Sequence, residues 1–256
     1  IEKEPDWIIN AAAYTAVEKA EEEPELAYKV NSEAPRSIAR ALSKKNGKLI
    51  QISTDFVFSG EQNYPYQPDQ KINPVCTYGL SKGLGEKYIL EILKENSYVI
   101  RTSWLYGPVG NNFLLTMLKL HEAKGKNNEF LKVVYDQISC PTSTSSLAIL
   151  CWNIIFKNEV KVPNIMHWSN LGVCSWYDFA YEIGTQGLEK GIIKNVAEVI
   201  PIRSKDYPSL AKRPNYSLLD CRKTRELFKI PSRHWKKEIS LVLDDIKSKE
   251  NQSFYA

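Results

Sequence analysis

The sequence predicts an α/β fold built on a doubly wound parallel sheet, followed by a smaller α-rich lobe. Two observations lead to this prediction. Up to about residue 157, short apolar runs alternate with helical patterns of about ten residues or more. This order is typical of βαβ units, whose parallel sheet is covered on both faces. Beyond that residue the helical patterns continue, but the apolar runs become short and irregular.

The strands of the predicted sheet are apolar runs bounded by small or polar residues, as buried strands are. They are "DWIINAAA", residues 49–53, "SYVIRTSWLYG" and "LKVVYDQ". Four helices are predicted between and after them, and the caps follow the usual start and stop residues. They cover residues 26–42 with Pro35 as an interruption, residues 78–96, residues 111–125 with Asn111 or Asn112 as cap, and residues 143–158.

The C-terminal part has a different texture. "NIMHWSNLG" predicts a short strand, and Ser175 is expected to cap a helix that starts with "SWYDFA". A long irregular segment with Pro208 and Pro214 precedes two further helices, near "CRKTRELFKI" and "RHWKKEISLVLDDIKSK". The sequence therefore predicts one domain over residues 1–157 and a lobe over residues 158–256, partly interleaved with it.

Composition excludes several classes of function. The 34 Lys and Arg residues are interspersed with 30 Asp and Glu residues, and a net charge of +4 without a basic stripe argues against nucleic acid. No run approaches the roughly 18 apolar residues of a membrane span. The three histidines form no metal-ligand pattern. The five cysteines are odd in number and lack CxxC spacing, which predicts reduced thiols in the cytoplasm.

Polar and small residues gather where the predicted strands end, in "NAAAYT", "STDFVFSG" and "RTSWLYG". Ligands of doubly wound sheets bind beyond these carboxyl ends. Tyr78 and Lys82 lie one turn apart on a helix beside this edge. A nearby ammonium lowers the pKa of a phenol, which is near 10, and prepares it to give a proton to a carbonyl oxygen. Thr54 is placed to orient that carbonyl, with Ser53 as the alternative. The Tyr78 and Lys82 pair taken alone is also compatible with an ordinary helix surface.

Thr54 followed by "YGLSK" resembles the Ser/Thr…YxxxK signature of extended short-chain dehydrogenases/reductases, which have a Rossmann-like fold. A larger set of blocks, in family order along nearly the whole chain, resembles the dTDP-4-dehydrorhamnose reductase family. The blocks are "INAAAYTAVEKAEEEPELAYKVN", "STDFVFSG", "PVCTYGLSKGLGEKYI", "IRTSWLYGPVGNNFLLTML", "VVYDQISCPTST", "HWSNLGVCSWYDFA" and "AKRPNYSLLD". YxxxK alone is a weak signal, but seven ordered blocks point past the superfamily to this family.

The resemblance implies hydride transfer from NADPH or NADH to the 4-keto group of dTDP-4-dehydro-6-deoxy-L-mannose, giving dTDP-L-rhamnose. It assigns a dinucleotide-binding role to the first domain and a substrate-binding role to the lobe. The implied catalytic residues are Tyr78 as proton donor, Lys82 and Thr54. The implied cofactor-binding residues are Ala12, Ala13, Tyr14, Thr15, Ser53, Tyr78 and Lys82. The implied substrate-binding residues are Thr54, Asp55, Trp104, Asn112, Phe113 and Arg213.

Some of these positions have plainer interpretations. The small residues Ala12 and Ala13 suit close approach of a nucleotide or simple packing, and Trp104 suits either a sugar face or the core under a loop. Arg213 offers the bidentate donors that phosphate oxygens accept, with Lys212 as a helper, or it forms a surface ion pair.

The roles of two further residues, the oligomeric state and the need for a metal ion are not decided by the sequence. Asn31 is either a kink residue that supports a proton relay or an ordinary polar helix residue, and Phe56 replaces a tyrosine usual in the family. The resemblance also leaves open a homodimer and, as in some relatives, Mg²⁺.

The sequence departs from the family at the cofactor loop. Its 12 glycines contain no GxxGxxG, the motif that holds a pyrophosphate at a helix N-terminus. The match begins near the fourth strand of the usual fold, so the N-terminal strands are expected to be missing and these residues alone to bind the cofactor poorly. Two alternative functions remain open: a non-catalytic nucleotide-binding subunit resembling the methionine adenosyltransferase β subunit, and another nucleotide-sugar reductase or epimerase.

Overall fold

The structure is a computed structural model, and it describes residues 4–157 and 161–253. Contacts between residues divide the chain into two compact units, each assembled from three separate segments. Unit 1 comprises Ile1–Ser103, Ala148–Trp168 and Ser209–Ile230. Unit 2 comprises Trp104–Leu147, Ser169–Pro208 and Pro231–Ala256. Each unit therefore combines parts of the chain that are distant in sequence.

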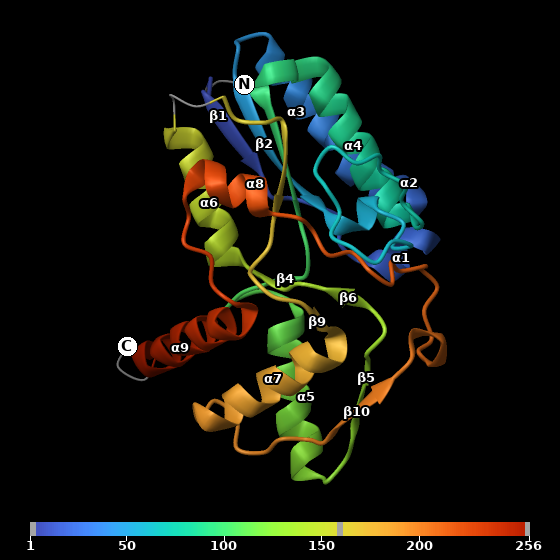
Figure 1. The fold of residues 1–256 in the computed structure, drawn as a ribbon, viewed down its shortest axis with the longest axis vertical. Coiled ribbons are helices and arrows are strands. Elements are labelled where there is room, and N and C mark those ends of the chain that lie inside the picture. The colour runs from blue at the N-terminus through green and yellow to red at the C-terminus, as the bar shows by residue number, and fades with distance from the viewer. Residues whose placement is uncertain (1–3, 158–160, 254–256) are drawn as a thin grey trace. The chain divides into compact units, whose positions relative to one another are not determined.

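Unit 1 is built on a parallel sheet with the strand order β1–β2–β3–β8 (Figure 1). In the register of this sheet Thr54 pairs with Thr102, and Thr102 pairs with Trp168. Three neighbouring strands therefore finish at the same level, which is where parallel sheets place their ligands. The four strands are β1 (Trp7–Asn10), β2 (Lys48–Thr54), β3 (Ser97–Thr102) and β8 (Ile165–Trp168).

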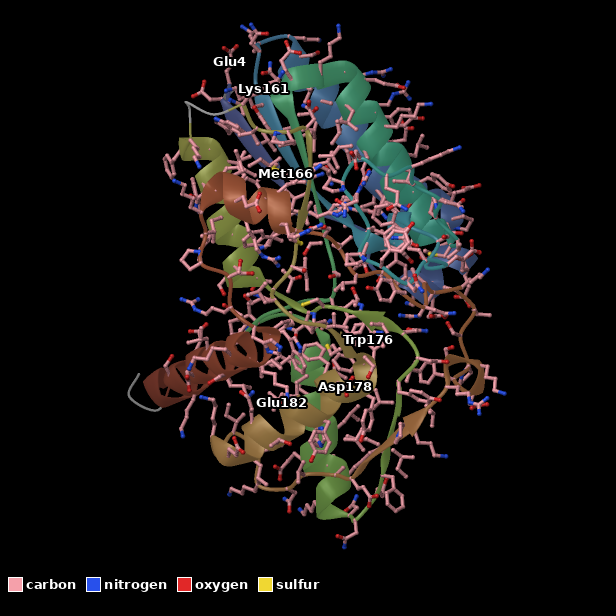
Figure 2. The ribbon with its side chains drawn as sticks, in the orientation of Figure 1. Glu4, Lys161, Met166, Trp176, Asp178 and Glu182 are labelled. Atoms are coloured by element: carbon pink, nitrogen blue, oxygen red, sulfur yellow. The ribbon has the colours of Figure 1, made fainter. Side chains whose placement is uncertain are left out.

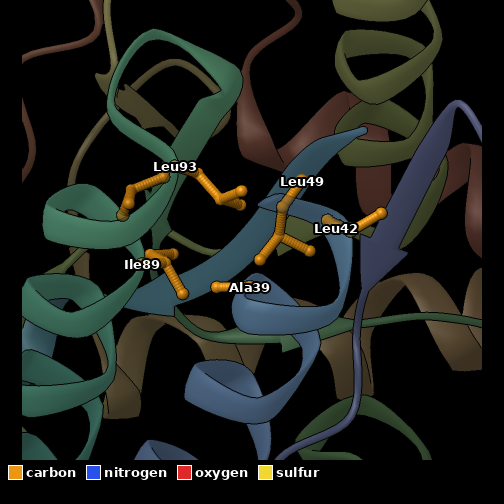
Figure 3. Packing of buried hydrophobic residues seen from close by; sticks show 6 residues of the cluster. Ala39, Leu42, Leu49, Ile89 and Leu93 are labelled. Carbon is orange, nitrogen blue, oxygen red and sulfur yellow. The ribbon is translucent and has the colours of Figure 1, made fainter. Parts of the chain in front are cut away.

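The helices of unit 1 lie along both sides of this sheet (Figure 1). An apolar cluster joins α3 and α4 to β2 and β3, and Figure 3 shows it from close by. It consists of Ala39, Leu42, Leu49, Ile89, Leu93 and Val99, each at most 5% exposed. The helical elements are α1 (Val17–Glu22), α2 (Pro24–Tyr28), a π-helical turn (Lys29–Glu33), α3 (Ala34–Ser43), α4 (Thr77–Leu93) and α8 (Arg222–Phe228), with short 3₁₀ turns at Asp55–Val57 and Lys94–Asn96.

In the part that the structure describes, unit 2 is α-rich and holds three two-stranded ladders. Helix α7 packs against α5 and α9, and Gly184 allows the close approach of α5, because an added Cβ there would lie 2.5 Å from the His121 ring. Helix α6 (Thr144–Phe156) begins in unit 2 and ends in unit 1. The other elements are α5 (Phe113–Lys126), α7 (Trp176–Glu189), α9 (Trp235–Ser253), a 3₁₀ turn (Ser204–Asp206), and the pairs β4 (Leu105–Tyr106) with β7 (Thr142–Ser143), β5 (Leu131–Val134) with β10 (Val199–Ile202), and β6 (Ile138–Ser139) with β9 (Cys174–Ser175).

The structure confirms the predicted α/β class, its parallel sheet and two predicted helix caps. Asn112 caps α5, and its side chain accepts a hydrogen bond from the N–H of Leu115. Ser175 caps α7 in a reciprocal arrangement with Asp178. Within the described residues, no helix combines the length and the apolar character that a bilayer crossing requires.

One run that was predicted as a strand of the main sheet forms a strand of a different sheet. The run "LKVVYDQ" forms β5, which pairs with β10 in unit 2. Instead β8, predicted as part of the C-terminal lobe, hydrogen-bonds to β3 and completes the main sheet. The predicted boundary after residue 157 falls at residues 158–160, outside the described residues. The division into a cofactor domain and a substrate lobe remains a prediction.

A buried ion pair ties the elements of unit 1 together beneath the strand ends. Arg101 on β3 and Glu86 on α4 are both 3% exposed, with Nη2 and Oε2 2.8 Å apart. The Ser53 hydroxyl on β2 also donates to the Glu86 carboxylate. Arg101 Nη1 donates to the carbonyl of Pro68 at 3.1 Å. Each charge is therefore compensated by several partners, as burial of charge requires.

We expect Arg101→Met to lower the free energy of unfolding by about 3–5 kcal/mol, because it leaves the Glu86 carboxylate buried without its counter-charge. Urea denaturation measures this change. The matched control is Lys87→Met, since Lys87 and Glu91 form an exposed pair on the same helix, 3.9 Å apart, and such pairs contribute less than about 1 kcal/mol. A loss below about 1 kcal/mol for Arg101→Met would contradict the prediction.

Candidate active site

The carboxyl end of β2 turns sharply into the segment that carries Thr54 and Asp55. The Thr54 hydroxyl accepts a hydrogen bond from the N–H of Phe56 at 3.1 Å and donates to Asp55 Oδ1 at 3.2 Å. Asp55 Oδ2 in turn accepts a hydrogen bond from the Ser217 hydroxyl at 2.5 Å. Ser53 points to Glu86, so Thr54 rather than Ser53 presents its hydroxyl beside Tyr78. Alternation of side chains along a strand explains why the two neighbours diverge.

Tyr78 and Lys82 both lie in α4, beside the end of β2. Tyr78 is partly exposed, and its ring packs edge to face against Phe56, with the centroids 5.5 Å apart. Lys82 is 4% exposed, and its Nζ donates to the carbonyl of Ile52 at 2.7 Å. An ammonium has three donors. Among the described residues this carbonyl is the hydrogen-bond partner recorded for Lys82, which leaves two donors for a ligand.

The pKa of Tyr78 shifts in the direction opposite to the predicted one. Burial of the phenol raises its pKa to about 12, while the hydrogen bond with Thr54 opposes the rise and the charge of Asp55 adds to it. Burial also lowers the pKa of Lys82 to about 8, against the opposing charge of Glu86. The spacing of the pair could not reveal this, because desolvation depends on the surrounding fold.

The loop after β1 contains four of the seven predicted cofactor residues, Ala12 to Thr15. Ala12 and Thr15 are exposed, while Ala13 and Tyr14 are partly exposed. Asn31 fixes this loop, since its side chain accepts from the N–H of Tyr14 at 2.9 Å and donates to the carbonyl of Tyr14 at 3.0 Å. The loop that follows β1 is therefore held at Tyr14.

Asn31 also connects this loop to the helix of Tyr78. Its amide donates to the Ser81 hydroxyl at 3.0 Å, and that hydroxyl donates to the carbonyl of Tyr78 at 2.8 Å. Asn31 is 2% exposed and lies in the π-helical turn before α3. Such turns often occur at functional sites. The structure thus gives Asn31 a bridging position rather than that of an ordinary polar helix residue.

Arg213 lies on the segment that follows β10 and belongs to unit 1. Its Nη2 donates to Glu18 Oε1 at 2.7 Å, and its side chain is 27% exposed. Its neighbour Lys212 is exposed. Further along the same block, the N–H of Asp220 donates to the carbonyl of Tyr66 at 2.8 Å, and Ser217 reaches Asp55. The "AKRPNYSLLD" block is therefore fastened to the segment that follows β2.

The other three predicted substrate residues belong to unit 2. Trp104 stacks on Trp176 with ring centroids 3.6 Å apart, and Figure 2 labels Trp176 at the start of α7. The φ angle of Trp104 is +46°, in the left-handed region that bulky residues rarely adopt and that often marks a functional position. Phe113 is partly exposed and packs against Trp176 with centroids 4.6 Å apart.

Asn112 has a clear structural task. Besides capping α5, its amide donates to the carbonyls of Gly107 and Val109, at 3.0 and 3.2 Å. The amide hydrogens therefore have partners in the loop, and the oxygen has its partner in the first turn of α5. This arrangement shapes the loop that precedes Phe113, and direct contact of Asn112 with a substrate remains a prediction.

The sequence interpretation missed several residues that organise this region. Glu21 accepts from both the N–H and the hydroxyl of Thr77, each at 2.8 Å, and so fastens the first turn of α4. Glu18 and Ser217 hold the segment around Arg213 and the side chain of Asp55. Both glutamates stand in the run "VEKAEEE", which has the appearance of a solvated helix face. The sequence indicated these two glutamates only through their positions in "AVEKAE", which lies within a block that resembled the family.

A parallel sheet with a Thr hydroxyl at one strand end, beside a helix with Tyr and Lys four residues apart, defines the class of short-chain dehydrogenases/reductases. Residues 1–248 match the family model described as "RmlD substrate binding domain", and the chain belongs to this family.

Several relatives carry the name dTDP-4-dehydrorhamnose reductase. The protein of that name from Aggregatibacter actinomycetemcomitans is 39% identical over 241 residues, which is 93% of this chain and 80% of the relative. The spore coat polysaccharide biosynthesis protein SpsK of Bacillus subtilis is 37% identical over 94% of this chain and 80% of its own length.

Solved structures agree with the sequence comparison. The dTDP-4-dehydrorhamnose reductase from Clostridium acetobutylicum has a TM-score of 0.86 and 38% identity, covering 96% of this chain and 82% of that one. The enzyme of the same name from Bacillus anthracis, solved in complex with NADP, has a TM-score of 0.84 and 33% identity, covering 95% of this chain and 82% of that one.

We expect the cost of burying the Lys82 ammonium to depend on pH. Above pH 8 the folded protein releases this proton, whereas the unfolded chain keeps it up to the ordinary lysine pKa of 10.5. The unfolded state then binds more protons, so wild-type stability gains relative to Lys82→Met as the pH rises. Between about pH 7 and 10.5, the free energy of unfolding of the wild type should therefore rise by about 3 kcal/mol relative to that of Lys82→Met.

Chemical denaturation across this pH range measures the difference. Lys87→Met serves as the control, because Lys87 is exposed on the same helix and its difference from wild type should stay flat. A pH-independent difference for Lys82→Met would show that the ammonium carries no burial penalty.

Proposed function

We propose that the chain acts as an NADPH-dependent dTDP-4-dehydrorhamnose reductase. The observation that carries the proposal is the convergence of Thr54, Tyr78 and Lys82 at the carboxyl end of β2. Relatives that share 33–39% identity over most of the chain bear this name. A non-catalytic nucleotide-binding subunit has no need for all three groups, so their joint presence favours the enzyme.

The residues at the strand ends fit a nicotinamide cofactor. Lys82 retains two donors that suit the hydroxyls of the nicotinamide ribose, and Tyr78 lies one turn away on the same helix. Ala12, which is exposed, and Ala13, which is partly exposed, offer close approach because their side chains are small. When bound, the nicotinamide supplies the hydride. NADPH is the cofactor we propose, since a relative of 33% identity was solved with NADP.

Tyr78 is suited to the proton transfer because its raised pKa keeps the phenol protonated at neutral pH. We assign it the donation of a proton to the 4-oxygen of the sugar, whose basicity rises as the carbonyl is reduced. The turn after β2 holds the Thr54 hydroxyl in place, and we assign it the orientation of that oxygen once its single proton turns from Asp55 to the substrate. Lys82 holds positive charge close to the site, which favours the phenolate left behind.

Arg213 is the proposed partner of the nucleotide diphosphate, because a guanidinium binds phosphate oxygens in a bidentate manner. Trp104 and Phe113, on unit 2, are the proposed contacts of the sugar and its surroundings. The described residues contain no group of three or more His, Cys, Asp or Glu side chains arranged around a metal position. The proposed steps use no metal ion.

A cytoplasmic location and a homodimer are also part of the proposal. All five cysteines are buried free thiols, which supports a reducing compartment. The homodimer rests on the family resemblance, and sedimentation analysis tests it.

We expect the protein, assayed with a Gly-rich cofactor loop ahead of these residues, to convert dTDP-4-dehydro-6-deoxy-L-mannose to dTDP-L-rhamnose with loss of NADPH absorbance, because residues 1–256 contain no GxxGxxG and alone should bind the cofactor poorly. Tyr78→Phe should lower the rate about a hundredfold or more, because it removes the proton donor but retains the ring that packs on Phe56. Steady-state absorbance, with product analysis, measures both results. Tyr88→Phe, which removes a hydroxyl from the same helix, is the matched control and should keep the wild-type rate.

Two outcomes would contradict this proposal. Rates within about threefold of wild type for Tyr78→Phe would remove Tyr78 from the proton transfer, since general acid groups contribute at least a hundredfold. Binding of both ligands without turnover by the wild type would favour the regulatory-subunit interpretation.

A further inference from the structure

Glu18 on α1 holds the segment of residues 209–213 with four hydrogen bonds. Its carboxylate accepts from the Ser209 hydroxyl at 2.8 Å and from the backbone N–H groups of Leu210 and Ala211 at 2.7 and 3.1 Å. The fourth donor is Arg213 Nη2, at 2.7 Å. A carboxylate has about four acceptor positions. Glu18 therefore has its full set of partners within one short segment.

The same segment is also held by apolar contacts. Ala211 is 4% exposed and packs in a cluster with Phe56 and Cys76, against which the ring of Tyr78 also packs. Pro214 lies so close to Gly60 that an added Cβ at Gly60 would be 2.5 Å from the Pro214 Cα. Arg213 therefore lies between two packed positions, Ala211 and Pro214, on a segment that packs beside Tyr78.

The ion pair orients Arg213 without using up its donors. A guanidinium carries five N–H donors in a rigid fork. Among the described residues Glu18 is the partner recorded for this side chain, and it takes a donor on one nitrogen only. The remaining donors are available to an anion, and the side chain is 27% exposed. A fixed arginine loses less conformational freedom on binding than a mobile one does.

We propose that Glu18 is a positioning residue for nucleotide-diphosphate recognition, which sets Arg213 and the backbone of residues 209–213 in the binding geometry before the ligand arrives. This inference rests on the proposed function, because it takes Arg213 as the phosphate partner. Glu18 itself does not contact the ligand; it acts through Arg213.

The state of the Glu18 carboxyl agrees with this role. Burial raises its pKa, but hydrogen bonds from Arg213, Ala211, Ser209 and Leu210 outweigh that effect and lower the pKa to about 2. The carboxylate is thus ionised throughout the range in which the enzyme would be assayed. Its effect on the ligand should therefore be constant across neutral pH.

Titration calorimetry with two probes, dTDP and thymidine, tests the proposal on the full chain. Glu18→Gln should weaken dTDP binding about tenfold or more, because the loss of one charge-assisted hydrogen bond has that scale. Thymidine has no phosphate, so its affinity should change less than about twofold if the effect passes through Arg213. The control Glu22→Gln makes the same charge change four residues further along α1, at an exposed position, and should leave both affinities unchanged.

A double-mutant cycle adds a second measurement. In the Arg213→Gln background, Glu18→Gln should cause no more than about a twofold further loss of dTDP affinity, because the two residues act through one contact. In the steady state, Glu18→Gln should raise the KM for the nucleotide sugar and leave kcat near the wild-type value. Circular dichroism and thermal unfolding report whether each variant is folded.

Either of two results would overturn the inference: dTDP affinity within about twofold of wild type for folded Glu18→Gln, or equal losses for dTDP and thymidine, which a general structural defect would produce. The dTDP-binding experiment can be distinguished from the test of the proposed function. A wild-type chain without reductase activity that still binds dTDP in a Glu18-dependent manner would refute the proposed function and support the inference.

Discussion

The buried carboxylate of Glu86 is the constraint on which the site depends. It neutralises Arg101 on β3, accepts from Ser53 on β2 and stands one turn after Lys82 on α4. A buried charge must be compensated by several partners. Here the groups around the carboxylate come from two strands of the sheet, β2 and β3, and from the helix α4 that covers it. The relative positions of β2, β3 and α4 are thereby fixed immediately beneath the groups proposed for catalysis. The negative charge also favours the ammonium form of Lys82 against the cost of its burial.

Beyond the ion pair of Glu86 and Arg101, the site is held mainly by side chains that form hydrogen bonds to the backbone. Asn31 fixes Tyr14, Glu21 fixes the first turn of α4, and Glu18 fixes the segment before Arg213. A side chain bonded to a backbone N–H fixes the chain path itself, whereas a bond between two side chains leaves the backbone free to move. Loops that carry binding groups benefit from such support, because preorganised groups lose less freedom when a ligand binds.

Local features of this fold were predictable, and non-local ones were not. The strands around Ile50 and Ile100 and the caps at Asn112 and Ser175 follow from short-range patterns, so the sequence sufficed for them. The pairing of β8 with β3 depends on segments more than sixty residues apart, and the apolar pattern of β5 does not distinguish the main sheet from a two-stranded ladder.

The same limit applies to the site. Tyr78 and Lys82 were found because their spacing is local, and Thr54 because it follows a predicted strand. The structure places the three together at one strand end. The glutamates at positions 18, 21 and 86 were not found, because an acidic residue on a helix is usually solvated and only the fold shows which one is bonded to other segments. Direct roles for Trp104, Asn112 and Phe113 depend on a ligand that no sequence pattern specifies, and they remain predictions.

The pKa of Tyr78 shows how burial changes the chemical interpretation. Spacing alone suggested a phenol made more acidic by Lys82, but desolvation raises its pKa to about 12 and lowers that of Lys82 to about 8. At neutral pH the phenol therefore keeps its proton and the amine remains largely charged. A reductase needs this combination, because the proton must stay on the donor until the substrate oxygen becomes basic enough to take it. The ammonium then stabilises the phenolate at the moment that it forms. Burial and positive charge thus act at different stages, the first before proton transfer and the second after it.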